Sequence, residues 1–150
     1  MDKYMNVAIL EAKKGITHQH GGPFGAVIVK DGLIISRGHN HVVVNHDPTL
    51  HGEIDAIRKA GKKLKTFDLT GCSIYTTAEP CPMCLGAILW ANIDKVYYGC
   101  NIEDTEKIGF RDKRFYEEDR NKRLKMIEVD REECLKLFHD YVDIDQKTQY

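Results

Sequence analysis

The hexapeptide EPCPMC at residues 79–84 and the triplet HGE at residues 51–53 carry the most informative side chains of this chain. Cys81 and Cys84 are three residues apart at the start of a predicted helix, so both sulfur atoms can lie on one helix face. A helix N-terminus also favours the thiolate forms that bind metal ions. A catalytic zinc site takes three protein ligands and leaves a fourth position for water, and His51 with the two cysteines supplies such a set.

Two other interpretations of the cysteine pair stay open at this point. A Cys-x-x-Cys pair can be a redox centre, although such motifs normally occur in a thioredoxin-like βαβ pattern, which the hairpin at the start of this chain fits poorly. A structural zinc site would need a fourth ligand, and the sequence has no second Cys-x-x-Cys pair. The remaining histidines are the candidates for that fourth ligand: His18, His20, His39, His41, His46 and His139.

Glu53 is a candidate acid–base group beside these ligands. Residues two apart point to nearly opposite sides in mid-helix, so His51 and Glu53 can reach one site only in a first helical turn. Helical spacing alone would favour Asp55, four residues after His51. For either acid the alternative is a place on a solvated helix face.

The pattern of apolar residues predicts an α/β fold. Asp31-Gly32 stands between two apolar runs and indicates a β-hairpin. Pro82 suits the first position of a helix, where its missing N–H costs nothing. Helices link the later strands, which predicts a mixed sheet with a parallel part and helices on both faces. The expected elements are helices over 3–18, 51–65, 82–91 and 131–143, and strands over 25–30, 33–38, 73–77, 95–99 and 126–129.

Length and composition fit one globular domain. The 150 residues are 42% apolar and 30% charged, and 22 basic residues face 23 acidic ones, which gives no support to nucleic-acid binding. The sequence has no apolar run long enough to span a bilayer and no signal peptide at its start, so we expect a cytoplasmic protein without membrane contact. Five cysteines, an odd number, argue against a disulfide framework.

The two quoted segments together resemble the H-x-E…P-C-x-x-C signature of the cytidine-deaminase-like zinc deaminase superfamily. The resemblance runs from Gly21 to Asp112 and so covers most of the chain. It implies a three-layer αβα sandwich with a central mixed five-stranded sheet. It also implies one zinc ion per chain, with His51, Cys81 and Cys84 as ligands and with Glu53 as a proton shuttle that does not bind the metal.

Within that superfamily the chain is most similar to bacterial-type guanine deaminases. This resemblance implies the hydrolysis of guanine, a small-molecule substrate, to xanthine and ammonia, with Glu53 and Asp112 as catalytic residues. It also implies a homodimer that exchanges C-terminal segments, about 131–150, so that the last residue covers the partner's active site. The residues that match substrate-binding positions are Phe24, Asn40, Gly52, Trp90, Asp112 and Tyr150.

One residue departs from the family pattern, because Gly52 stands where alanine is usual. A glycine keeps the backbone N–H that can contact the substrate, but it costs about 1 kcal/mol in a helix and loosens the pocket. Other reactions with the same core motifs remain alternatives, namely deamination of adenosine in tRNA, of cytosine or of guanosine. The non-enzymatic alternative is a zinc-stabilised binding module, which would have no need of Glu53.

Overall fold

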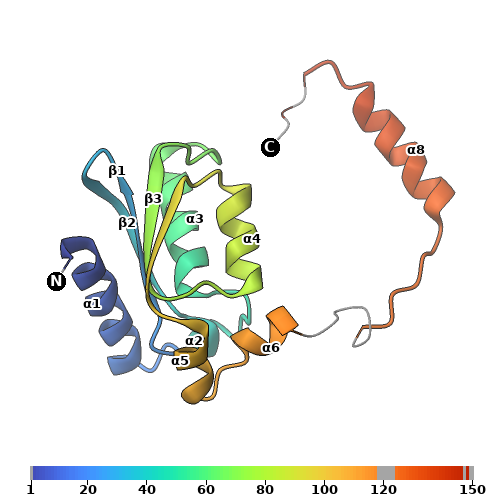
Figure 1. The fold of residues 1–150 in the computed structure, drawn as a ribbon. Coiled ribbons are helices and arrows are strands. Elements are labelled where there is room, and N and C mark those ends of the chain that lie inside the picture. The colour runs from blue at the N-terminus through green and yellow to red at the C-terminus, as the bar shows by residue number, and fades with distance from the viewer. Residues whose placement is uncertain (1, 118–123, 147, 149–150) are drawn as a thin grey trace. The chain divides into compact units, whose positions relative to one another are not determined.

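The computed structural model describes residues 2–117, 124–146 and 148, and the chain divides into two units, Met1–Tyr116 and Glu117–Tyr150. The first unit contains a sheet flanked by helices (Figure 1). The described elements are α1 (Lys3–Thr17), β1 (Gly25–Lys30), β2 (Leu33–His39), α2 (Val42–Asn45), α3 (Gly52–Leu64), β3 (Cys72–Ala78), α4 (Pro82–Trp90), β4 (Lys95–Cys100), α5 (Ile102–Lys107), α6 (Asp112–Glu117) and α8 (Arg131–Val142).

The sheet is mixed, as the sequence predicts, with strand order β2-β1-β3-β4. Strand β1 is antiparallel to both β2 and β3, whereas β3 and β4 are parallel and are connected through α4. The predicted hairpin is confirmed. Asp31 and Gly32 have φ angles of 49° and 76°, the left-handed pair that a tight two-residue connection between twisted strands requires.

Strand β1 is buried on both faces because its side chains alternate between two apolar clusters. Ala26 and Ile28 pack with residues of α3 and α4, while Val27 and Val29 pack against Ala8 of α1. Figure 1 shows the same arrangement, with α1 on one side of the sheet and α3 and α4 on the other. A strand covered on both faces reads as a continuous apolar run, which is what residues 26–29 are.

The start of α3 lies close against β2, and Gly38 makes this possible. A Cβ atom at Gly38 would lie 2.5 Å from the backbone nitrogen of Ala56 and 2.6 Å from the carbonyl oxygen of Gly52. Both are helix backbone atoms, which cannot move aside without displacing the helix. The missing side chain therefore sets how closely the first turn of α3, which follows His51, approaches the sheet.

The expected fifth strand over 126–129 is wrong, and the described sheet has four strands. Met126, Ile127 and Val129 favour extended backbone, but a strand forms only where a neighbouring strand accepts its hydrogen bonds. Residues 124–130 have no such partner among the described strands. The expected closing helix does form as α8, while the short helices α2, α5 and α6 were not anticipated. Within the described residues no helix has the length and hydropathy needed to cross a bilayer.

Candidate active site

Two helix starts bring three potential metal donors together. His51 and Cys81 are the N-cap residues of α3 and α4, both with extended backbone, and the His51 imidazole makes no capping bond. The His51 Nδ1 atom lies 3.7 Å from the Cys81 sulfur and 3.5 Å from the Cys84 sulfur. One nitrogen and two sulfur atoms thus lie within 4.8 Å of one another, with both cysteines buried.

The electrostatics of this group suit a cation at its centre. The hydrogen bond with the Cys84 thiol lowers the pKa of Cys81 to about 4. The same hydrogen bond with Cys81, together with burial, raises the pKa of Cys84. The two thiols therefore share one proton, because two adjacent buried thiolates repel each other. A divalent ion would allow both to ionise, and two thiolates with one imidazole are the donor set of a catalytic zinc site.

Glu53 lies in the first turn of α3, as the spacing from His51 requires. Its side chain is only 6% exposed, and burial raises the pKa of its carboxyl group above the usual range. The competing acid, Asp55, is engaged elsewhere. Its Oδ2 atom lies 2.6 Å from the Lys59 ammonium and accepts the His39 backbone N–H at 3.3 Å. Glu53 is therefore the acid that accompanies the metal donors.

A cavity of about 330 Å³, within the range of small-molecule sites, is lined by His51 of the donor group. Its lining includes five of the residues that the sequence singles out, but Gly52, Cys81, Cys84 and Trp90 are not among the lining residues. The lining residues are Gly22, Phe24, Asn40, Val42, Val43, Pro48, His51, Glu53, Ala78, Glu79, Phe110, Arg111, Asp112 and Phe115.

Phe24 and Asn40 occupy adjacent parts of the cavity wall. Phe24 meets Phe110 edge to face, with ring centroids 4.7 Å apart. The Asn40 backbone N–H donates to the Phe24 carbonyl oxygen, and the Asn40 Oδ1 atom accepts the Val42 N–H at 3.0 Å. Because Oδ1 is used in this way, the amide NH₂ group of Asn40 is its remaining donor. Sequence reasoning missed Phe110, although it lies only two residues before Asp112.

Gly52 packs directly under this wall. A Cβ atom there would lie 3.0 Å from the carbonyl oxygen of Phe24, closer than most side chains approach a backbone oxygen. The departure from alanine therefore fits the position of Phe24 in this chain.

Trp90, at the end of α4, is 67% exposed, so within one chain the structure does not bring it to the cavity. Tyr150 lies outside the described residues.

Helix α6 supplies a second acid to the cavity lining. Asp112 begins the helix and lines the cavity, and burial, with the nearby Cys81 sulfur, raises the pKa of its carboxyl group. The Tyr116 hydroxyl donates to the Pro80 carbonyl oxygen at 2.7 Å, which joins α6 to the segment before Cys81. This contact, which involves a residue the sequence analysis did not select, holds Asp112 near the metal donors.

Comparison with known proteins agrees with this geometry. Residues 1–100 match the cytidine and deoxycytidylate deaminase zinc-binding region. A guanine deaminase of Bacillus subtilis (strain 168) is 48% identical over 117 residues, which are 78% of this chain and 75% of that protein. A tRNA-specific adenosine deaminase of Buchnera aphidicola subsp. Schizaphis graminum is 35% identical over 119 residues, 79% of each chain.

An X-ray structure of guanine deaminase from Bacillus subtilis matches with a TM-score of 0.92 and 40% identity, covering 100% of this chain and 99% of that one. The family match spans residues 1–100 and so includes His51, Cys81 and Cys84, the same residues that the structure brings together. The chain therefore belongs to the cytidine and deoxycytidylate deaminase family of zinc-dependent enzymes.

Proposed function

We propose that this protein hydrolyses guanine to xanthine and ammonia. The observation that carries the proposal is the position of Glu53, a buried carboxyl group next to three zinc donors in the wall of a ligand-sized cavity. A structural zinc site has no use for a buried acid that is not a ligand. The similarity to guanine deaminases supports the choice of base among the reactions open to the family.

The chemistry follows from the metal donors and from the carboxyl group of Glu53. His51, Cys81 and Cys84 would hold a zinc ion, which would supply the positive charge that lowers the pKa of a neighbouring water toward about 7. Glu53 takes a proton from the attacking water, whose oxygen adds to the amino-bearing ring carbon, and passes that proton to the ring nitrogen. It then takes the remaining proton of the added hydroxyl and passes it to the amino group, the C–N bond breaks as the carbonyl forms, and ammonia leaves. Burial, which raises the pKa of Glu53, suits a group that holds a proton between these steps.

Asp112 supports the preference for guanine. Guanine presents two adjacent donors, the ring N1–H and the amino group, and an ionised carboxylate can accept both. Adenine and cytosine present an unprotonated ring nitrogen at the corresponding place, so the carboxylate would be left unpaired. That mismatch costs several kcal/mol, enough for a discrimination of about 10³-fold or more. The Asn40 amide would add a donor, and Phe24 would hold the ring plane.

An ammonia-release assay on guanine, guanosine, adenine, cytosine and a tRNA anticodon stem-loop tests the proposal. Guanine should be the best substrate, and Asp112→Asn should reduce its turnover while leaving the fold intact. Asp94→Asn is the matched control, because Asp94 is exposed and its bond to the Gly71 N–H can be kept by an asparagine oxygen. Faster turnover of the tRNA stem-loop would favour the adenosine deaminase alternative. Intact guanine activity in Asp112→Asn would refute the role of Asp112.

We also infer that the protein acts as a homodimer in which segments of about 131–150 are exchanged and Tyr150 closes the partner's cavity, with Trp90 beside the base. Two observations support this. The match to the guanine deaminase structure covers the whole chain, and Leu137 and Phe138 of α8 are 65% and 64% exposed. Apolar side chains exposed together favour burial against another surface.

The placement of α1 on one face of the sheet, with α3 and α4 on the other, supports our proposal of a three-layer αβα architecture.

A further inference from the structure

A second group of potential metal ligands lies apart from the thiolate group and shares no residue with it. His20 lies between α1 and β1, His39 ends β2, and His41 precedes α2. One ring nitrogen from each lies within 4.8 Å of the other two. His39 is buried, while His20 and His41 are partly exposed, so small ions in solvent can reach the group.

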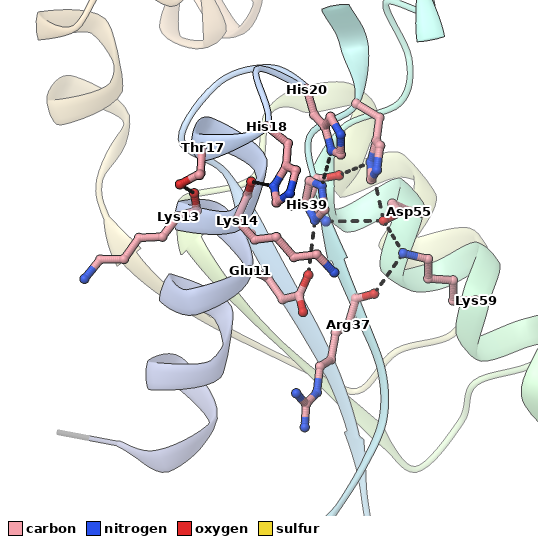
Figure 2. Close-up of polar contacts among 12 residues, drawn as sticks. Glu11, Lys13, Lys14, Thr17, His18, His20, Arg37, His39, Asp55 and Lys59 are labelled. Carbon is pink, nitrogen blue, oxygen red and sulfur yellow. Dashed lines mark hydrogen bonds and ion pairs between the residues drawn. The ribbon is translucent and has the colours of Figure 1, made fainter. Parts of the chain in front are cut away.

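Two of these nitrogens already face each other. The His20 Nδ1 atom lies 2.8 Å from the His39 Nε2 atom, and the two rings are inclined by only 12° (Figure 2). Their centroids are 5.1 Å apart, so the rings meet nearly edge to edge and the two nitrogens point at each other. One ring donates its N–H to the lone pair of the other, and a bound metal ion would take the place of that proton.

The outer nitrogens of the group are held by acceptors, as metal-binding histidines require. The His39 Nδ1–H donates to the Glu11 carboxylate at 3.1 Å, and Figure 2 shows Glu11 reaching from α1 toward this ring. The His41 Nδ1–H donates to the His39 carbonyl oxygen at 2.7 Å, with the Asp55 carboxylate 3.7 Å away. Such contacts fix the tautomer and leave Nε2 unprotonated, the form that binds a metal ion.

We propose that His20, His39 and His41 form a second metal site, which binds a divalent first-row transition-metal ion through three imidazoles. Imidazole donors suit Zn²⁺, Ni²⁺ and Co²⁺. With metal–nitrogen bonds of about 2.0–2.1 Å and tetrahedral angles, neighbouring nitrogens lie about 3.3 Å apart. The His20–His39 pair would therefore open by about half an ångström and tilt toward a common point, which the loop that carries His20 can provide. The His41 ring, which is stacked on His20 and His39 with centroids 4.9 and 4.1 Å away, would turn its Nε2 toward the same point.

Cobalt titration of the zinc-loaded protein tests this proposal. Zinc binds more tightly than cobalt to a given site, so added Co²⁺ should leave the thiolate site alone and fill the imidazole site. We expect one further equivalent of Co²⁺ by calorimetry, with a visible spectrum that lacks thiolate-to-cobalt charge transfer. His20→Gln and His41→Gln should abolish this equivalent, and Glu11→Gln should weaken it by about 10–100-fold.

His46→Asn is the matched control, because it removes an exposed imidazole and asparagine tolerates the left-handed backbone at this position. It should leave the second equivalent unchanged. The proposal is overturned if no second equivalent binds, which would leave only a proton between His20 and His39. It is also overturned if His46→Asn weakens binding as much as His20→Gln, or if the spectrum shows thiolate ligation. His20 and His41 are partly exposed, so their variants should fold, and circular dichroism checks that they do.

Discussion

The sharpest test of the active site is Glu53→Gln, which separates a catalytic acid from a metal ligand. Glutamine has nearly the same shape as glutamate and removes only the ability to carry a proton. Glu53 is 6% exposed, and burial already disfavours its charged form, so the neutral replacement should not destabilise the fold. The three donors of the metal group are unchanged, and zinc should therefore remain bound.

The expected loss of activity follows from the role of the group. Removing a positioned acid–base group costs about 10²–10⁴ in rate. At 1.36 kcal/mol for each factor of ten, that loss raises the activation barrier by about 2.7–5.4 kcal/mol. Glu53 acts on both the attacking water and the leaving amino group in the proposed mechanism, so we expect the upper part of this range. Ammonia release measures the rate, and elemental analysis measures zinc in the same sample.

Glu79→Gln is the matched control for this experiment. Glu79 also lines the cavity, but its Oε2 atom accepts the Ile102 N–H at 2.9 Å, and a glutamine oxygen can keep that bond. The control should retain zinc and most of its activity. Loss of zinc from Glu53→Gln would mean that Glu53 is a ligand. Normal turnover by Glu53→Gln would refute the mechanism. Asp55 is poorly placed to take over the role of Glu53, because its carboxylate is bound to Lys59.

Three further changes have defined outcomes. Cys84→Ala should lose most of its zinc, measured by elemental analysis, while Cys100→Ala, at an exposed cysteine, should keep it. Equal zinc retention in the two variants would remove Cys84 from the ligand set. A chain that ends before Gln146 should stay folded by circular dichroism but release ammonia slowly, and full activity would argue against a lid from the C-terminal segment. Gly38→Ala should lower the free energy of unfolding by about 1–3 kcal/mol in a denaturant titration, because its Cβ meets helix backbone. Gly86→Ala, whose Cβ meets nothing within 4 Å, should instead gain up to about 1 kcal/mol of helix propensity.

Short-range patterns explain what could be predicted about the site before the structure. The Cys-x-x-Cys spacing and the proline between the cysteines are local features of one helix start, and so is the place of Glu53 in a first turn. The Asp31-Gly32 hairpin is equally local. Such features depend on backbone geometry over a few residues, so they keep their meaning whatever the rest of the chain does.

Long-range packing decided the rest. Asp55 has better helical spacing from His51 than Glu53 has, yet its carboxylate faces Lys59 and β2, because the close approach at Gly38 sets how α3 lies on the sheet. The segment 126–129, with Ile127 and Val129, favours extended backbone, but only a neighbouring strand could have made it part of the sheet.

The sequence by itself determined the zinc donor set, because each donor lies at a helix start. Spacing left Glu53 and Asp55 open as the acid, and the resemblance to zinc deaminases favoured Glu53. Only the tertiary structure decided which distant side chains meet. His20 and His39 are 19 residues apart, and no local period relates them; they face each other because the hairpin returns β2 alongside the end of α1. Trp90 is at a family position, yet its exposure depends on the orientation of α4. Contacts of this kind arise from strand order and helix packing, and periodicity within one segment carries no information about either.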